Sequence, residues 1–140
     1  MAEKDEEELQ KTLMQLESGR RQLDSIAKQA QMVESALLEV NATIQALNAL
    51  AEVKDGTEIL VNLGANTFAK ASLKEKDKIL IGVGACMSVE KSRADAVKSL
   101  EGRRDELAKS LVSLQKMSND VGAKVAQLND AAESMIGHRH

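Results

Sequence analysis

A few residues in this sequence have side chains that nucleotide binding, metal binding or catalysis would need. Gly82, Val83 and Gly84 form a short glycine-rich segment, but no Gly-Lys-Ser or Gly-Lys-Thr follows it, as a phosphate-binding loop requires. His138 and His140 have metal-ligating side chains, yet no cysteine lies near them, which favours a solvated tail. Neither histidine has a Ser or Cys partner for nucleophilic catalysis. The sequence therefore predicts no catalytic residue, no cofactor and no metal site, and we expect that the protein is not an enzyme.

Cys86 is the only cysteine, so no disulfide can form within the chain. Its neighbours from Gly82 to Val89 read as a strand or tight turn and supply no group that would activate the thiol. A structural role is therefore favoured over a reactive one. A single unpaired cysteine also predicts a reducing, intracellular location, the cytoplasm.

Charge and hydropathy together argue against two classes of partner, nucleic acids and membranes. Nineteen basic and 22 acidic residues give a net charge of -3, so a strongly basic surface for nucleic acid is not expected. No uninterrupted apolar run approaches the roughly 18 residues that a membrane-spanning helix needs. The sequence therefore predicts no signal peptide, no transmembrane helix and no membrane partner.

The composition favours long helices over a conventional globular core. The chain has no Pro, Trp or Tyr, and Phe68 is its only aromatic residue. A compact core of this size normally uses several aromatic side chains, because each buries a large apolar area. Leu, Ala, Val and Ile interleaved with 29% charged residues are typical of coiled coils. We expect one domain, spanning residues 1–140.

Heptad repeats predict two coiled-coil helices, over residues 4–53 and 91–137. In each, apolar residues recur every seven positions, which marks a coiled coil rather than a general amphipathic helix. Arg104 and Ser118 interrupt the second seam, and setting the register is their simplest role. The first row contains Leu9, Leu16, Leu23, Ala30, Leu37, Ile44 and Ala51; the second contains Leu100, Leu107, Leu114, Val121, Leu128 and Met135.

The two helices have similar lengths and flank a compact insert, which predicts an antiparallel hairpin. One register places apolar residues opposite each other over the whole length, with Ile44 facing Leu100, Ala30 facing Leu114 and Leu16 facing Leu128. In the same register Gly19 faces Val125 and Thr12 faces Ala132. These small or polar residues bury little apolar area, so we expect the seam to be looser toward the free end.

Residues 57–90 change pattern and predict two short β-hairpins. Runs of β-branched residues are interrupted by Gly, Ala and Asn at the expected turns. So short a segment cannot bury a core alone, and its edge strands would leave backbone groups unpaired. We therefore expect it to pair with other subunits. The predicted oligomer interface contains Ile59, Val61, Leu63, Phe68, Ile79, Ile81 and Val83.

Apolar residues outside the seam gather near the free end of the predicted hairpin. Leu13, Met14 and Ile136 occupy positions that do not face the partner helix. Flexible methionine and leucine side chains on a loose tip suit promiscuous binding of apolar segments, although a frayed coiled coil would show the same pattern. The candidate binding residues are Leu9, Leu13, Met14, Leu16, Leu128, Met135 and Ile136.

The β segment resembles a known family. Residues 56–64, GTEILVNLG, resemble the first hairpin of alpha-class prefoldin subunits. Residues 78–85, KILIGVGA, followed by Val89, Glu90 and Lys91, resemble the second hairpin and the entry into the last helix. Two hairpins look alpha-class rather than beta-class. The chain departs from the family at Asn62, where Pro is usual, and at Cys86, where Gly is frequent.

This resemblance implies a prefoldin-like fold and an ATP-independent holdase. Prefoldins are hexamers, typically of two alpha-class and four beta-class subunits. Their β segments form a shared body, and their coiled-coil tips capture unfolded proteins for delivery to a group II chaperonin. Beta-class subunits, non-native polypeptides and a group II chaperonin are thus the implied partners. A filament-forming or tethering coiled-coil protein of the same fold is the alternative, since it would need self-complementary hairpins but not apolar tips.

Overall fold

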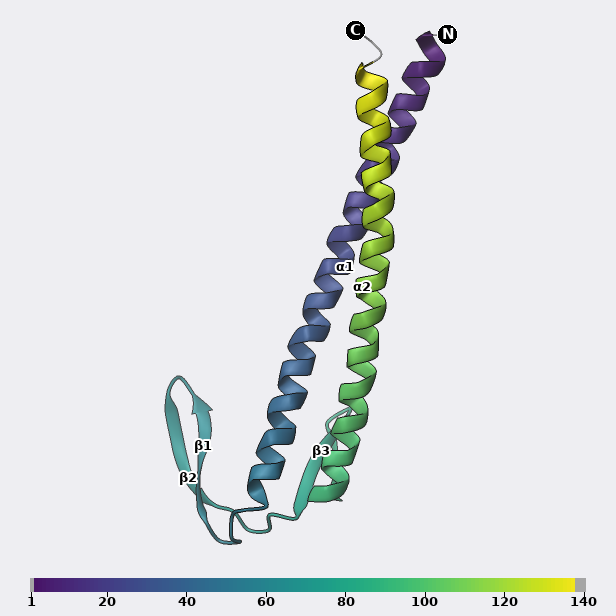
Figure 1. The fold of residues 1–140 in the computed structure, drawn as a ribbon. Helices are drawn as coiled ribbons and strands as arrows, with labels where there is room; N and C mark the ends of the chain where they lie inside the picture. Colours follow the sequence, from purple (N-terminus) through teal and green to yellow (C-terminus); the bar gives the residue numbers. More distant parts are fainter. Residues whose placement is uncertain (1, 138–140) are drawn as a thin grey trace. The chain divides into compact units, whose positions relative to one another are not determined.

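A computed structural model describes residues 2–137 and shows two long helices separated by two β-hairpins (Figure 1). The helices are α1 (Ala2–Leu50) and α2 (Arg93–Gly137). Hairpin 1 consists of β1 (Glu58–Gly64) and β2 (Thr67–Ser72), and hairpin 2 consists of β3 (Lys78–Gly84) and β4 (Met87–Ser92). The expected fold, a coiled-coil helical hairpin with two central β-hairpins, is confirmed.

The first helix ends three residues before the expected boundary at Val53. The N–H groups of Ala51, Glu52 and Val53 donate to carbonyls three residues back, at 3.1–3.2 Å, so the chain tightens out of the α-helix after Leu50. No basic residue lies in the last turn of α1. Lys76 supplies the missing cation, because its Nζ donates to the carbonyl of Ala51 at 3.2 Å.

The second helix begins at Arg93, two residues later than expected. Lys91 and Ser92 belong to β4, where they pair with Ile79 and Lys78. The Ser92 hydroxyl accepts a hydrogen bond from the backbone N–H of Asp95 at 3.1 Å, which is N-cap geometry. The last strand therefore passes directly into the helix through a capping serine.

The chain forms two compact units, which are described separately. The terminal unit contains residues 1–36 and 107–140, and the central unit contains residues 37–106. In the terminal unit α1 and α2 lie side by side in opposite directions (Figure 1). The side chains buried there are those of Leu9, Thr12, Leu16, Ile26, Leu114 and Ala132. In the central unit, Val40, Ile44, Leu47 and Ala96 are buried.

The predicted register is confirmed where Gly19 meets Val125. A Cβ atom added to Gly19 would lie only 2.7 Å from Cγ2 of Val125, so the two residues face each other directly. Ala30 and Leu114, another predicted pair, line one shared hollow with Ile26 and Ser118. The antiparallel alignment read from the heptads thus holds at both places.

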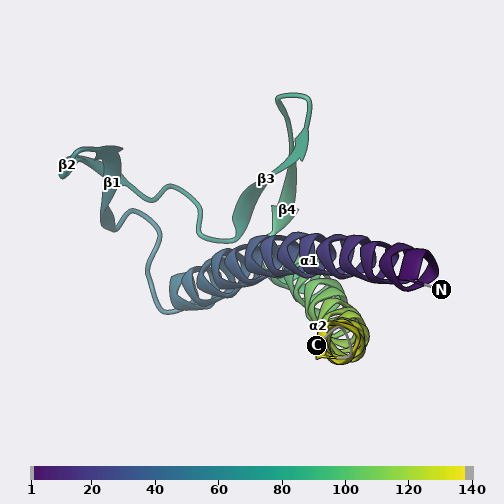
Figure 2. The ribbon, with the colours of Figure 1, turned by 90° about the horizontal axis from the view of Figure 1, so that it is seen from above.

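Each hairpin is a separate two-stranded antiparallel sheet closed by its own tight turn (Figure 2). The turn residues Ala65 and Asn66 have φ values of 48° and 60°, and Ala85 and Cys86 have 50° and 60°. Two consecutive positive φ angles are those of a type I′ turn, whose twist matches that of the strands. A bulge before each turn leaves one residue of the first strand without a partner, Leu63 in hairpin 1 and Val83 in hairpin 2.

Candidate functional site

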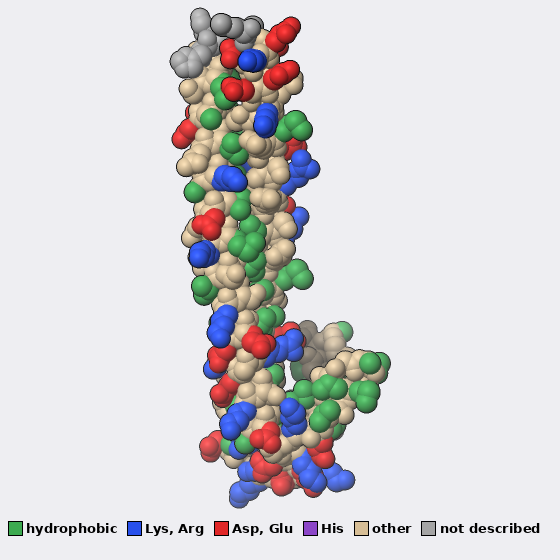
Figure 3. Space-filling model, turned by 90° about the vertical axis from the view of Figure 1, so that its right-hand side faces the viewer, with side chains coloured by type: hydrophobic (Ala, Val, Ile, Leu, Met, Phe, Trp, Pro, Cys, Tyr) green, Lys and Arg blue, Asp and Glu red, His purple; other side chains and the backbone are tan. Residues whose placement is uncertain are grey.

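The predicted interface residues lie on the two hairpins, and most of them face solvent. Val61, Leu63, Phe68 and Val83 are exposed, with Leu63 at 64%. Ile59, Ile79 and Ile81 are half-buried. Hydrophobic side chains gather visibly over the β segment (Figure 3). Apolar surface exposed on two-stranded sheets is typical of interaction sites, and the interface at these residues stays a prediction.

The sequence analysis missed four further apolar residues of this surface. Leu60, Leu80, Met87 and Val89 are also exposed, and Leu80 reaches 72%. Leu60 and Leu80 point to the face opposite their strand neighbours, because side chains alternate along a strand. The signal was present in β3, where Ile79, Leu80 and Ile81 form a continuous apolar run typical of strands covered on both faces.

Charged side chains lie at the ends of these hairpins. Glu58 and Lys70 form a cross-strand ion pair in hairpin 1, with 3.8 Å between Oε1 and Nζ. In hairpin 2, Lys78 donates to Glu75 at 3.2 Å. This hydrogen bond, the charge of Glu75 and the more distant charge of Glu90 raise the pKa of Lys78. All these groups are exposed, so they contribute to orientation more than to stability.

The candidate binding residues for unfolded proteins, called clients below, divide into three groups by exposure. Leu13, Met14 and Ile136 are exposed, with Met14 at 70%. Leu128 and Met135 are half-buried. Leu9 and Leu16 are buried in the helix–helix seam and become accessible only if the helices separate. The structure thus presents three of the predicted residues on the surface and keeps two inside.

The helix–helix seam is packed at two of the positions where the sequence predicts it to be looser. Thr12 and Ala132 are both buried, and the Thr12 hydroxyl donates to the carbonyl of Glu8 at 2.8 Å. A threonine can be buried without loss because its own helix accepts this hydrogen bond. These two residues are packed in the seam, and the expectation that this end is looser stays a prediction.

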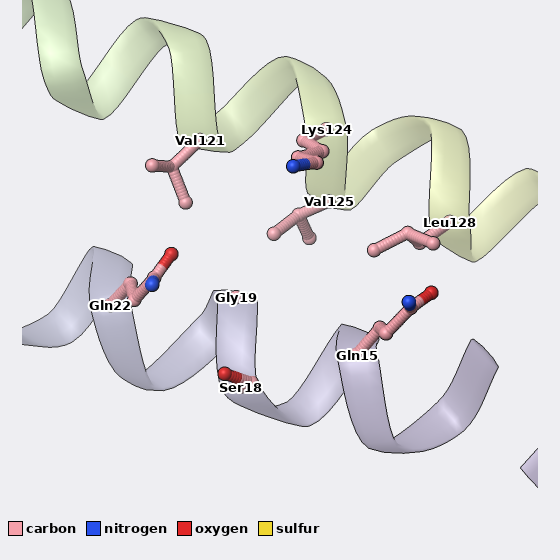
Figure 4. A pocket seen from close by; sticks show the side chains of 8 residues that line it. All are labelled: Gln15, Ser18, Gly19, Gln22, Val121, Lys124, Val125 and Leu128. Carbon is pink, nitrogen blue, oxygen red and sulfur yellow. The ribbon is translucent and has the colours of Figure 1, made fainter. Parts of the chain in front are cut away.

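A hollow lies beside Gly19, another position where the sequence predicts a looser seam, as Figure 4 shows. Its volume is about 230 Å³, and residues of both helices line it. Because Gly19 has no side chain, Val125 packs against its backbone, and the hollow lies beside this contact with Gln15 and Gln22 at its edges. The hollow is lined by Gln15, Ser18, Gly19, Gln22, Val121, Lys124, Val125 and Leu128.

Nothing in residues 2–137 forms a metal centre, since no three His, Cys, Asp or Glu side chains come together there. His138 and His140 lie outside the described residues. Cys86 is exposed at the turn of hairpin 2. Neither described helix is long and apolar enough to cross a membrane.

Comparison with known proteins agrees with this architecture. The family model described as prefoldin subunit matches residues 19–137, most of the chain. The chain belongs to the prefoldin family. Prefoldin subunits are components of a chaperone.

Similar prefoldin sequences come from several archaea, and all three named here are called prefoldin subunit alpha. The one from Thermofilum pendens is 30% identical over 80% of this chain and 84% of its own length. The relative from Methanoregula boonei is 30% identical over 97% of this chain and 94% of its own length. The relative from Methanoculleus marisnigri is 31% identical over 94% of this chain and 83% of its own length.

Solved prefoldin structures share the fold. A cryo-EM structure of filamentous PFD from Methanocaldococcus jannaschii matches with a TM-score of 0.73 at 18% identity, covering 84% of this chain and 97% of that one. The prefoldin beta subunit from Thermococcus strain KS-1 matches with a TM-score of 0.59 at 21% identity, covering 91% and 90%.

Proposed function

We propose that this chain is the alpha-class subunit of a cytoplasmic, ATP-independent holdase. Its hairpins would join those of beta-class subunits in a body, in a hexamer of two alpha-class and four beta-class chains. Its tip, meaning residues 2–16 of α1 and 128–137 of α2, would capture non-native polypeptides for a group II chaperonin. The observation that carries the proposal is the exposure of Leu13, Met14 and Ile136 on that tip.

The tip combines exposed apolar side chains with a tightly closed seam. Met14 and Leu13 are flexible side chains that adapt to different apolar partners, which a binder of many unfolded proteins needs. Leu9 and Leu16 are buried in the seam. A client would therefore first meet the surface residues and reach the seam residues only if the helices separate.

The hairpins supply the second part of the proposal. Exposed apolar residues on both faces of a two-stranded sheet cost solvation free energy until another chain covers them. Free strand edges also offer unpaired N–H and C=O groups to a further strand. Neighbouring subunits satisfy both requirements, so assembly through the hairpins is part of the proposed function.

The test separates the tip from the rest of the protein. The assembly would be prepared with Leu13, Met14 and Ile136 all changed to Ser, and suppression of aggregation of a denatured model protein would be measured without ATP. Each lost apolar contact removes about 1 kcal/mol from client binding, so we expect at least roughly tenfold weaker suppression. The mass of the assembly should not change.

A control uses three apolar residues away from the tip that are together more exposed than the tip residues. Met32, Leu38 and Val112 are 72%, 74% and 68% exposed, and changing all three to Ser should leave the suppression intact. If the control weakens suppression as much as the tip variant does, clients bind to exposed apolar residues along the helices and not specifically to the tip. Undiminished activity of a chain lacking residues 1–17 and 127–140, at unchanged mass, would also refute a tip site.

A filament-forming or tethering role is the second candidate, favoured by the exposed hairpins and by the likeness to a filamentous PFD. Such a protein would assemble without limit in the absence of beta-class subunits. Sedimentation of the chain alone and with a beta-class subunit distinguishes the two, because the holdase subunit should form a closed complex with the partner.

A further inference from the structure

The hollow beside Gly19, which we call the Gly19 hollow, has an apolar wall that the partner helix leaves partly uncovered. Val121, Val125 and Leu128 of α2 line it and are only half-buried, although they occupy seam positions. Its volume of about 230 Å³ exceeds the roughly 150 Å³ of an engineered apolar cavity that holds a benzene ring. The Gly19 hollow therefore has room for one aromatic or aliphatic side chain.

The rim of the Gly19 hollow carries polar side chains that have no partner within the described chain. Gln15, Gln22 and Lys124 line it, and among residues 2–137 no side-chain hydrogen bond or ion pair involves them. Glu17 and Arg21 of α1 instead pair with each other at 3.8 Å. Lys124 is the only charged residue that lines the hollow, so an anionic group is favoured at its rim.

A second hollow in the terminal unit carries the opposite charge. It has a volume of about 190 Å³ and lies beside Ala30, with Ile26, Leu111 and Leu114 among its apolar lining. Glu34 is the only charged residue that lines it. The two hollows thus offer similar apolar walls and differ in the sign of their single charge, which can distinguish one bound segment from another.

The spacing of Gln15 and Gln22 suits a polypeptide that continues past both ends of the Gly19 hollow. The two side chains extend from α1 toward α2 at these ends (Figure 4). Seven residues of helix span about 10 Å, which roughly three residues of extended chain cover at about 3.3 Å each. Each amide both donates and accepts hydrogen bonds, as a bound backbone requires. The middle residue would place its side chain in the hollow and displace water from the apolar wall.

We propose that the Gly19 hollow holds one apolar side chain of an extended non-native polypeptide, and that Lys124 selects segments with Asp or Glu two positions away. Side chains two positions apart share a face of an extended chain, so both would point toward the helices. The long flexible stem of Lys124 lets its ammonium meet a carboxylate on either side. The inference rests on the proposed function, because it extends client capture from the tip to an adjacent hollow that shares Leu128 with it.

Short labelled peptides with blocked ends test this preference on the full-length chain. The acidic peptide is Gly-Ser-Asp-Ser-Phe-Ser-Asp-Ser-Gly, and others replace both Asp by Asn or by Lys, or Phe by Ser. By fluorescence anisotropy, the acidic peptide should bind about two- to fivefold more tightly than the Asn peptide, as exposed ion pairs do. Loss of Phe should weaken binding at least roughly tenfold, because its burial is lost. About 0.15 M salt, with a screening length of about 8 Å, limits the influence of the acidic residues near the N-terminus.

Reversing one charge on the protein makes the result specific to the Gly19 hollow. Lys124→Glu should invert the order, so that the Lys peptide binds most tightly. Lys116→Glu is the matched control, because it makes the same charge change at an exposed residue of α2 that lines neither hollow. It should leave the order unchanged. A photoreactive benzoyl group on the Phe ring should cross-link to residues 15–22 or 121–128.

Three results would overturn the inference: no binding of the acidic peptide, the same order of peptides in the wild type and Lys124→Glu, or cross-links only outside the Gly19 hollow. Tightest binding of a peptide that ends in Phe with a free carboxylate would also overturn it, because the hollow would then bind chain ends. The holdase proposal survives all four results if the assembly suppresses aggregation through Leu13, Met14 and Ile136. A wild-type assembly that fails to suppress aggregation would remove the holdase proposal, whatever the peptides do.

Discussion

Four residues at the hairpin turns are not glycines yet have positive φ angles. Asn66 tolerates this left-handed conformation because its short polar side chain bonds locally, but Ala65, Ala85 and Cys86 do not have that advantage. In the family that the chain resembles, Gly is frequent at the position of Cys86, and the left-handed conformation explains this preference. Cys86 thus occupies a glycine-type position, and its conformation does not depend on the thiol.

Replacing Cys86 with Gly should stabilise the hairpin. A left-handed conformation costs a residue with a Cβ roughly 1–2 kcal/mol, and Gly gives back roughly 0.5–1 kcal/mol through its greater freedom in the unfolded chain. The expected net gain is about 0.5–1 kcal/mol, measured by thermal unfolding of the assembled protein. Asn66→Gly is the matched control and should change stability little. A loss of stability in Cys86→Gly would show that the thiol makes a contact in the assembly.

Asn62 forms a local hydrogen bond at the bulge of hairpin 1. Its side-chain Oδ1 accepts a hydrogen bond from the backbone N–H of Gly64 at 2.8 Å, which bends the strand at the bulge. Hairpin 2 has Gly82 at the corresponding place and needs no such bond. The sequence predicted both turns from their glycines, but not this bond or the positive φ angles, because these depend on the detailed backbone path.

At the scale of the elements, long repeats were predictable and their ends were not. Six heptads in α1 leave little doubt about a helix, and apolar residues at facing positions fix one register. The ends depend on single hydrogen bonds instead, such as the Ser92 cap of α2 and the Lys76 contact with Ala51, just after α1. Several nearby residues could have capped α2 or donated a hydrogen bond at the end of α1, so the sequence alone did not identify Ser92 and Lys76.

Gly19 permits the close contact of the two helices in the terminal unit. Gly19→Ala should destabilise the protein, because the new methyl group would meet the Val125 side chain at 2.7 Å and valine has little rotamer freedom in a helix. Such overpacking costs roughly 1–3 kcal/mol, which exceeds the roughly 1 kcal/mol that alanine gains over glycine in a helix. The midpoint of thermal unfolding, followed by circular dichroism, should fall.

Gly122→Ala provides the control in the partner helix of the same unit. Nothing lies within 4 Å of the added atom, so only the helix propensity acts and stability should rise by about 1 kcal/mol. In a Val125→Ala background, Gly19→Ala should become stabilising as well, because the clash is gone. If Gly19→Ala stabilises the wild-type chain, the helices are not in close contact at Gly19.

For the whole molecule, the exposure of the hairpins was predictable from the sequence, and the packing of the tip was not. The hairpins were expected to need partners because so few residues cannot bury a core, and their apolar side chains are indeed exposed. The seam was expected to be looser at Thr12 and Ala132, yet both side chains are buried in it. Side-chain size alone suggested a weak seam, but a threonine satisfied by its own helix packs well next to alanine.

Removing the hairpins should separate assembly from helix formation. A chain in which residues 57–91 are replaced by a short glycine-rich turn keeps Ser92 as the cap of α2 and keeps both helices. Its buried seam residues in the terminal unit do not involve the hairpins, so the helical signal per residue of α1 and α2 should persist. The sedimentation mass should fall to that of one copy, because the apolar surface that other chains would cover is gone.

A single substitution gives the milder form of this experiment. Ile81→Asp places a carboxylate on a half-buried strand position, and in an assembled body an unpaired buried charge costs several kcal/mol. The subunits should dissociate, whereas Met32→Asp on an exposed helix position should leave the mass unchanged. An unchanged mass in both the hairpin deletion and Ile81→Asp would place the assembly surface on the helices. Dissociation by Met32→Asp alone would do the same, because that residue has no contact to lose unless another chain covers it.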